Sequence, residues 1–134
     1  MSRQSLEEIA DLLRKNDQYR VVQKYKKPLG YNLNNGIKSR KKFVGAFVDI
    51  EATGLLYSSD KLIELGMVKF EYTECGHILY LLEEFNSYQD PNIPIPDHIT
   101  KLTGISNDMV KGYSISEDQV SEYLKDVDII IALN

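Results

Sequence analysis

Residues 47–55 read Phe-Val-Asp-Ile-Glu-Ala-Thr-Gly-Leu, and they end an apolar run that begins at Phe43. Such a near-continuous apolar run predicts a core strand from Phe43 to Ile50 with both of its faces buried. Side chains two residues apart in a strand share one face, so Asp49 and Glu51 project to the same side, about 6.6 Å apart along the backbone. The strand is therefore expected to end with two carboxylates on one face.

These two carboxylates indicate a metal site. Two acids on one face repel each other, and burying them without a partner is costly, whereas a bound divalent cation removes both penalties. Carboxylate oxygens suit Mg²⁺ or Mn²⁺, and two such ions about 3.5–4 Å apart can stabilise the attacking and leaving oxygens of a phosphodiester. Asp49 and Glu51 are therefore candidate catalytic residues and metal ligands. The alternative is a pair of solvated acids at a strand end.

The motif and its surroundings resemble a known family. Residues 49–55, Asp-Ile-Glu-Ala-Thr-Gly-Leu, are similar to the first motif of the DEDD superfamily of 3′-to-5′ exonucleases, with Ala52 in place of a threonine. The segments that resemble later parts of that family are Asp60–Val68, Pro94–Pro96, Leu102–Val110 and Ile129–Asn134. The resemblance covers about residues 43–134 in order, in the style of proofreading exonucleases like the epsilon subunit of DNA polymerase III.

This resemblance implies both a fold and an activity. The expected fold is α/β, a ribonuclease H-like mixed sheet with flanking helices, truncated at its C-terminus. The implied activity is metal-dependent 3′-to-5′ exonuclease hydrolysis of nucleic-acid phosphodiesters, with two Mg²⁺ or Mn²⁺ ions in the complete site. The implied substrate is the 3′ end of single-stranded DNA or RNA, and a DNA polymerase is a further expected partner.

The resemblance also suggests a role for individual residues. In the resembling enzymes, the position of Asp49 bridges both metal ions and that of Glu51 binds the ion beside the attacking water. The residues implied to bind the 3′-terminal nucleotide are Ala52, Thr53, Gly54, Leu55, Leu102 and Thr103. Glycine lets a backbone approach a sugar-phosphate closely, and aromatic side chains such as Tyr57 can stack on bases.

The family site requires four acids and a histidine or tyrosine that activates water, and this sequence matches two of the acids. Leu133 also replaces the histidine that usually precedes the asparagine at the Asn134 position. We therefore expect the 134-residue chain to be inactive by itself. An exposed sheet edge and apolar surface in such a truncated domain would favour self-association.

Two other functions compete with the exonuclease. A truncated domain could bind nucleic acid or a partner protein without cutting, which the incomplete acid set favours. A haloacid-dehalogenase-like phosphatase would end its nucleophilic strand with Asp-x-Asp-x-Thr, but this sequence has Glu51 at the second acid and continues with Gly54 and Leu55. Covalent aspartyl-phosphate formation would distinguish that phosphatase.

Composition limits the class of protein. The chain has 134 residues, and its 43% hydrophobic and 27% charged content is typical of a globular protein. It contains no apolar run of about 18 residues and no apolar core of a signal peptide at its start. Cys75 is the single cysteine, so an internal disulfide is impossible. These features predict no membrane contact and a cytoplasmic location.

Charge divides the chain into two expected regions. Residues 1–42 contain 11 Lys and Arg against 4 Asp and Glu, a net charge of +7, whereas residues 43–134 carry −11. We expect 1–42 to form a basic N-terminal helix, an extended segment and a linker, and 43–134 to form the N-terminal portion of the exonuclease domain. The basic region could attract phosphate or could be a solvated linker.

Local patterns predict the remaining elements. A capping box at Ser5 predicts a helix over 6–15, and another at Ser116 predicts a helix after it. Asp97 is expected to cap a short helix that ends at Gly104. The other expected elements are an extended segment at 19–26, a linker at 28–36, strands at 62–72 with a bulge or close approach at Gly66, at 77–85 and at 128–132, and a turn at 74–76.

Overall fold

The computed structural model describes residues 6–15, 36–38 and 41–132, and the chain divides into two units, Met1–Gly30 and Tyr31–Asn134. The first unit contains α1, Leu6–Arg14, which confirms the predicted helix. The expected cap at Ser5, the segment at 19–26 and most of the linker lie outside the described residues. The proposed boundary at residue 42 stays a prediction.

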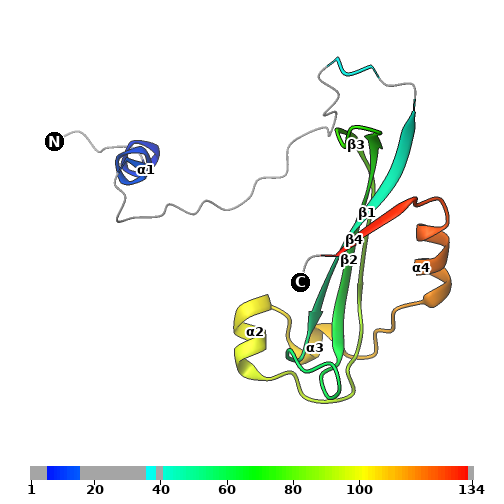
Figure 1. The fold of residues 1–134 in the computed structure, drawn as a ribbon. Coiled ribbons are helices and arrows are strands. Elements are labelled where there is room, and N and C mark those ends of the chain that lie inside the picture. The colour runs from blue at the N-terminus through cyan, green and yellow to red at the C-terminus, as the bar shows by residue number, and fades with distance from the viewer. Residues whose placement is uncertain (1–5, 16–35, 39–40, 133–134) are drawn as a thin grey trace. The chain divides into compact units, whose positions relative to one another are not determined.

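The described part of the second unit is built on one mixed sheet of four strands in the order β3–β2–β1–β4 (Figure 1). The strands are β1 Lys42–Ala52, β2 Leu62–Thr73, β3 Ile78–Tyr88 and β4 Ile129–Ala132. β1 pairs antiparallel with β2, and β2 pairs antiparallel with β3. β4 instead runs parallel to β1, which requires the long crossover between β3 and β4.

That crossover contains three helices, α2 Asp97–Thr103, α3 Asn107–Val110 and α4 Glu117–Leu124. Within the described ranges, no helix is long and apolar enough to cross a membrane. The predicted cap of α4 is confirmed, because the Ser116 hydroxyl accepts a hydrogen bond from the backbone N–H of Gln119 at 3.3 Å. The sequence patterns did not predict α3, whose four residues are too few to show a helical period.

The ends of α2 agree with the sequence in part. Gly104 ends the helix in the left-handed conformation, with φ of 80°, as predicted. Asp97, however, is the first helical residue, and the N-cap is Pro96, which has no side-chain donor or acceptor. The predicted Asp97 cap is therefore wrong, although an acid in the first turn still complements the helix dipole.

The predicted irregularity at Gly66 is also wrong. Gly66 lies between Asp49 and Asn86 in an uninterrupted ladder, and a Cβ added to it would have Asp49 O as its nearest contact, at 3.9 Å. The β1–β2 register shifts instead between Glu51 and Ala52, where β1 leaves the sheet. The irregularity that the sequence predicted at Gly66 is therefore found at the end of β1.

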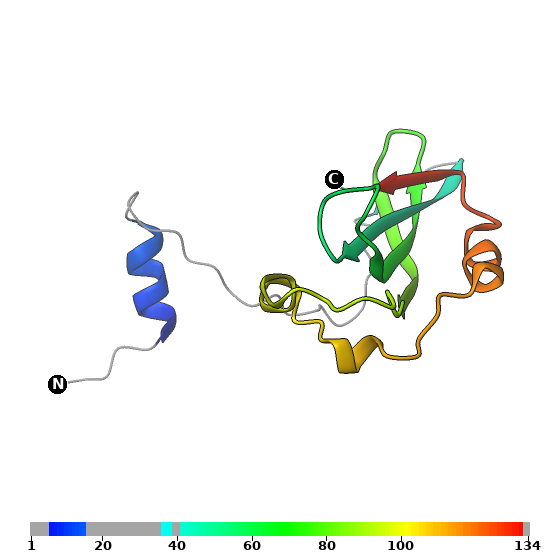
Figure 2. The same ribbon diagram turned by 90° about the horizontal axis from the view of Figure 1, so that it is seen from below.

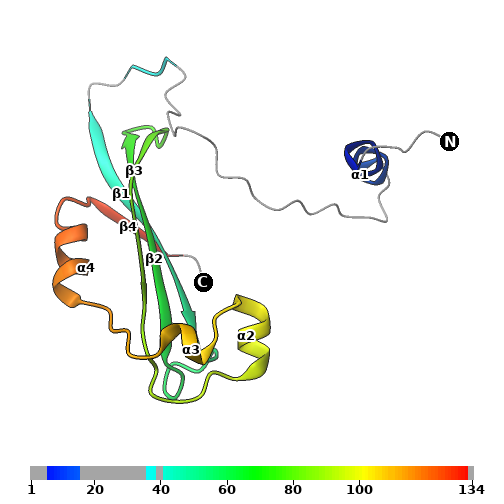
Figure 3. The ribbon, with the colours of Figure 1, turned by 180° about the vertical axis from the view of Figure 1, so that it is seen from behind.

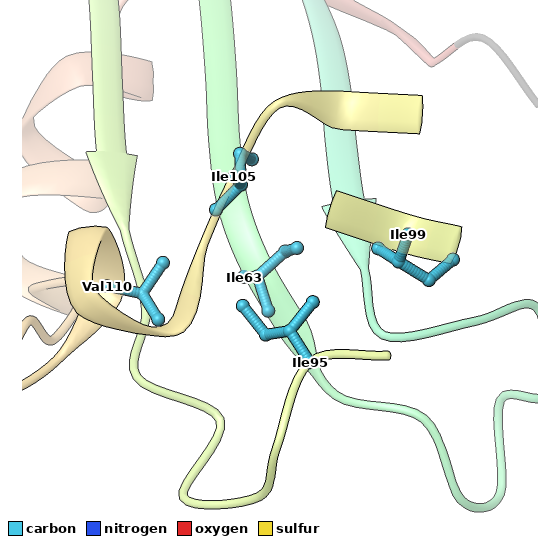
Figure 4. Packing of buried hydrophobic residues seen from close by; sticks show 5 residues of the cluster. All are labelled: Ile63, Ile95, Ile99, Ile105 and Val110. Atoms are coloured by element: carbon cyan, nitrogen blue, oxygen red, sulfur yellow. The ribbon is translucent and has the colours of Figure 1, made fainter. Parts of the chain in front are cut away.

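All three crossover helices lie on the face of the sheet to which Ile63 and Lys69 point (Figure 2). Side chains alternate along β2, so Ile63 and Lys69 point to the same face. Ile63 is fully buried there in a cluster with residues from the loop before α2, from α2, from the connection after it and from α3 (Figure 4). The cluster comprises Ile63, Ile95, Ile99, Ile105 and Val110.

Lys69 fastens α4 to the same face. Its side chain is 7% exposed, and its Nζ lies 2.7 Å from Asp126 Oδ1, 3.6 Å from Glu83 Oε2 and 4.6 Å from the centre of the Tyr123 ring. The Tyr123 hydroxyl donates a hydrogen bond to the Glu83 carbonyl at 2.7 Å. The hydrogen bond from Lys69 holds the pKa of Asp126 below its usual value of 3.8. The buried ammonium therefore has the partners that burial requires.

The expectation that the first core strand is buried on both faces is correct for its middle, where the neighbouring residues Gly45 and Ala46 point to opposite faces, and wrong for its end. Only Gly45 and Ala46 of β1 are buried, whereas Asp49 and Ile50 are exposed. The crossover helices cover the face to which Ile63 points, and alternation along the paired strands turns Asp49 and Glu51 to the other. β4 is an edge strand that leaves Ile129 and Ile130 exposed. Self-association through such an edge stays a prediction.

Two glycines in neighbouring strands should differ in their tolerance of a methyl group. A Cβ at Gly45 would lie 2.4 Å from the Phe70 ring, which is 3% exposed and stacks on Phe47 at 4.6 Å. We expect Gly45→Ala to lower the free energy of unfolding by about 1–3 kcal/mol, because a packed ring must move. Urea unfolding measures this, with Gly66→Ala as the matched control. Equal effects at both sites would contradict the packing argument.

The Lys69–Asp126 pair should make stability depend on pH. The pKa of Asp126 is lower in the folded chain, so the pair stabilises the fold above the carboxyl's usual 3.8, and this contribution is lost as the pH falls through the lowered value. We expect Asp126→Asn to destabilise the chain at neutral pH and to match the parent chain in acid. Urea unfolding across pH tests this, with Glu122→Gln at an exposed ion pair as control. A deficit independent of pH would exclude the ion pair as its cause.

Candidate metal and nucleotide site

Asp49 and Glu51 lie together at the end of β1, on the face away from the crossover helices. Asp49 is exposed and pairs with Gly66, and its Oδ1 accepts a hydrogen bond from the Ile50 N–H at 3.1 Å. Glu51 is half-buried and pairs with Glu64 on β2. The structure therefore places both predicted acids on one face, as alternation along the strand requires.

Glu64 is a third acid at this place, and the sequence interpretation missed it. Directly opposed residues of antiparallel strands share a face, so the Glu51 and Glu64 carboxylates are like-charged neighbours. Asn86 Nδ2 donates a hydrogen bond to Glu64 Oε1 at 2.8 Å. The signal in the sequence was an acid inside the apolar run from Leu62 to Val68. Only the register of β2 against β1 brings it to Glu51.

The donor chemistry of this face fits a hard divalent cation, because carboxylate oxygens are the ligands that Mg²⁺ and Mn²⁺ prefer. Across residues 6–15, 36–38 and 41–132, however, no group of three or more His, Cys, Asp and Glu side chains is arranged to hold a metal ion. Asp49 and Glu51 thus supply the right type of ligand for part of a coordination sphere. Their role as metal ligands stays a prediction.

The chain after Ala52 forms a loop, residues 53–61, that is closed at its neck by Thr53 and Lys61. The Thr53 N–H donates to the Lys61 carbonyl at 2.8 Å, and the Lys61 N–H donates to Thr53 Oγ1 at 2.9 Å. Thr53 is 3% exposed. Its hydroxyl is therefore committed to the loop itself, so the predicted contact between Thr53 and a nucleotide would have to use the backbone.

Asp60 joins the neck of this loop to its tip. Its Oδ1 accepts from the Thr53 hydroxyl at 3.0 Å, and its Oδ2 accepts from the Leu56 N–H at 2.7 Å. The Asp60 N–H donates back to the Leu56 carbonyl at 2.8 Å. A Cβ added at Gly54 would lie 2.5 Å from Asp60 Oδ2. The glycine of the motif therefore makes room for the Asp60 carboxylate.

The tip of the loop presents apolar side chains to solvent. Leu55 and Tyr57 are fully exposed and Leu56 is 67% exposed. Leaving a large apolar side chain in water forgoes about 1.5–3 kcal/mol of burial. Three such residues on a hydrogen-bonded loop beside two acids form a surface that suits an apolar ligand group.

Leu102 and Thr103 come from α2, which lies at the end of the sheet where β1 stops (Figures 1 and 3). Leu102 is 81% exposed. The Thr103 hydroxyl donates to the Ile99 carbonyl at 3.0 Å and accepts from the Ile105 N–H at 3.1 Å. The structure therefore leaves Leu102 available to a ligand and uses the Thr103 hydroxyl to end its helix.

A hollow of about 740 Å³ lies elsewhere, over the side of the sheet that carries α4. Lys69, Glu83, Tyr123 and Asp126 are among the residues that line it. Lys69 already pairs there with Asp126 and Glu83, and the lining includes neither Asp49 nor Glu51. This hollow is therefore no part of the candidate site.

Comparisons with known proteins agree with the motif. The sequence profile of the exonuclease family matches residues 46–134. The chain is 36% identical over 103 residues to DNA polymerase III PolC-type of Caldanaerobacter subterraneus subsp. tengcongensis, covering 72% of this chain and 7% of that protein. It is 38% identical over 83 residues to DNA polymerase III subunit epsilon of Aquifex aeolicus, covering 60% and 38%. The chain thus spans a small part of these relatives.

Solved structures show the same fold. An exonuclease I structure superposes with a TM-score of 0.52 at 14% identity, covering 69% of this chain and 21% of that one. The E. coli exonuclease I complex with a 5cy-dA13 oligonucleotide gives 0.51 at 14% identity, with 69% and 21% covered. The expected ribonuclease H-like α/β fold is therefore confirmed. The segment equivalent to this chain is a fraction of that larger enzyme.

The opposition of Glu51 and Glu64 gives a testable consequence. Like charges directly opposite each other in a sheet are destabilising, so Glu64→Gln should raise the free energy of unfolding by about 0.2–1 kcal/mol in metal-free buffer. Glutamine can still accept the hydrogen bond from Asn86. Urea unfolding with EDTA measures this, and Glu74→Gln in the exposed turn is the control. A destabilised Glu64→Gln chain would refute the repulsion.

Proposed function

This chain belongs to the exonuclease family, and from that premise we propose that it forms the N-terminal part of a metal-dependent 3′-to-5′ exonuclease domain. The observation that carries the proposal is the placement of Asp49 and Glu51 on one open face beside a loop with an exposed apolar tip. The acids suit a metal–phosphate centre, and the tip suits a nucleobase.

Asp49 and Glu51 would hold the divalent cations of this site, two Mg²⁺ or Mn²⁺ ions in the complete domain. Bound there, such ions stabilise negative charge on the oxygens of a phosphodiester undergoing displacement. The protein's own contribution is the end of β1, which places both carboxylates on one face. Glu64 lies next to Glu51 and adds negative potential, which attracts a cation before any nucleic acid arrives.

The substrate that fits this arrangement is the 3′ end of a single strand of DNA or RNA. A terminal nucleotide with its phosphate near Asp49 and Glu51 would find apolar groups on the neighbouring loop and on α2, namely Leu55, Leu56 and Leu102. A single strand can expose its bases to such side chains, whereas a duplex keeps them stacked. We propose a DNA polymerase as the physiological partner, since the relatives named above are DNA polymerase III proteins.

A second candidate is a domain that binds nucleic acid without cutting it. The two matched acids fall short of the four in the family pattern, and the described residues form no larger metal-binding group. Two carboxylates hold a cation less rigidly than a full ligand set. We therefore expect the 134-residue chain to bind Mn²⁺ and single strands but not to shorten them.

Metal binding tests the proposed site directly. We expect the parent chain to bind Mn²⁺ in a calorimetric titration and Asp49→Ala to lose at least tenfold in affinity, because one of two ligands is gone. The matched control is Asp118→Ala, an exposed acid on α4. Unchanged Mn²⁺ affinity in Asp49→Ala would remove that residue from the site.

Turnover separates the two candidate functions. A 5′-labelled single-stranded oligonucleotide is incubated with the chain and Mn²⁺, and its products are resolved by length. Progressive shortening from the 3′ end that Asp49→Ala abolishes would assign catalysis to this chain alone. Mn²⁺-dependent binding without shortening would match our expectation. Binding that ignores both Mn²⁺ and Asp49 would favour a domain with no metal-dependent role.

A further inference from the structure

We propose that Asp60 is a positioning residue for the nucleotide pocket: its carboxylate holds the loop of residues 53–61 in the shape that presents Leu55 and Tyr57 to a 3′-terminal base. This inference rests on the proposed function. Asp60 lies outside the first motif and acts through the loop, without touching the nucleotide.

The first step in the argument is the bonding of the Asp60 carboxylate. Its two oxygens accept from two different parts of the loop, the Thr53 hydroxyl at the neck and the Leu56 N–H at the tip. Hydrogen bonds to a charged acceptor are stronger than neutral ones. Asp60 is also half-buried, so water competes less for these bonds. One side chain thus determines the path between neck and tip.

The second step is the fit of Gly54 against Asp60. Any side chain at position 54 would place its Cβ within 2.5–2.7 Å of the Asp60 carboxyl atoms. Cβ atoms essentially never approach other atoms so closely, so the carboxylate occupies the space that glycine leaves. The motif glycine and Asp60 therefore depend on each other, although they lie six positions apart in the sequence.

The third step is the exposure of the tip. Leu55 and Tyr57 are fully exposed although their loop is closed by hydrogen bonds at both its neck and its tip. Burying either side chain would stabilise the chain by about 1.5–3 kcal/mol, so stability does not explain their exposure. A pre-formed apolar surface binds a base at a smaller entropic cost than a loop that must first order. Asp60 supplies that order.

Binding to two forms of one oligonucleotide tests the inference. The probes are a linear single-stranded oligothymidine with a free 3′ end and its covalently closed circle, each with Mn²⁺ and measured by fluorescence anisotropy. We expect Asp60→Ala to weaken binding to the linear probe about tenfold, within the range that loss of one base stack causes. Binding to the circle, which has no 3′ end, should not change.

Conservative and matched variants separate positioning from general damage. Asp60→Asn keeps an acceptor for Leu56 and a donor for Thr53, and should retain binding to the linear probe within about threefold. Asp118→Ala, an exposed acid on α4, should bind both probes as the parent does. If Asp60→Ala fails to fold, Thr53→Val removes the hydroxyl's bonds to Asp60 and to the Lys61 N–H while keeping the side-chain volume, and it should show the same selective loss.

A tryptophan at the tip of the loop of residues 53–61 measures directly how much the tip moves. The chain has no tryptophan, so Tyr57→Trp introduces a single one at the tip. In that background, Asp60→Ala should lower the tryptophan anisotropy under conditions where the whole chain remains folded, and Asp60→Asn should not. An unchanged anisotropy would overturn the positioning role.

The outcomes test the role of Asp60 separately from the proposed recognition of a 3′ end. If the parent chain binds linear and circular probes equally, 3′-end recognition fails, and the positioning role fails with it. If the parent prefers the linear probe and both Asp60→Ala and Thr53→Val keep that preference, the role of Asp60 alone is wrong. A selective loss in these variants supports both.

Discussion

The pairing of β1 with β2 is the constraint on which the rest of this structure depends. Its register runs without interruption from Lys42 to Glu51 and places Asp49 opposite Gly66 and Glu51 opposite Glu64. Side chains alternate along a strand, so a slip of one residue would turn every one of them to the other face. The acids would then point toward the crossover helices. Register therefore determines that Asp49 and Glu51 lie on the face away from the crossover helices.

Two contacts keep the crossover helices on their own face. The cluster around Ile63 fixes α2 and α3, and truncating a fully buried isoleucine of this kind costs about 2–5 kcal/mol. Lys69 fixes α4 through Asp126 and Tyr123. A buried ammonium is costly unless it is paired, so Lys69 stabilises one arrangement of α4 and penalises others. Because Ile63 follows the 53–61 loop by two residues, the core also anchors one end of that loop.

In the loop of residues 53–61, the polar side chains are hydrogen-bonded to one another, whereas the apolar side chains are exposed to solvent. Asp60 and Thr53 use their side chains to close it, while Leu55 and Tyr57 stay in water. Apolar side chains of a folded protein are normally buried, and segments that break such rules concentrate at functional sites. The exposed tip beside Asp49 and Glu51 is such a segment. Stability and binding thus use different side chains of one short segment.

Short-range patterns in the sequence determined the first strand and its acid pair, the turn at Gly76, the left-handed end of α2 and the cap of α4, because alternation, turns and caps each depend on a few neighbouring residues. The pairing of residues far apart in the sequence determined the features that these short patterns could not predict. The exposed end of β1, the regular ladder through Gly66, the approach of Glu64 to Glu51 and the bonds from Asp60 to Thr53 and Leu56 all depend on residues that only the folded sheet and its loop bring together.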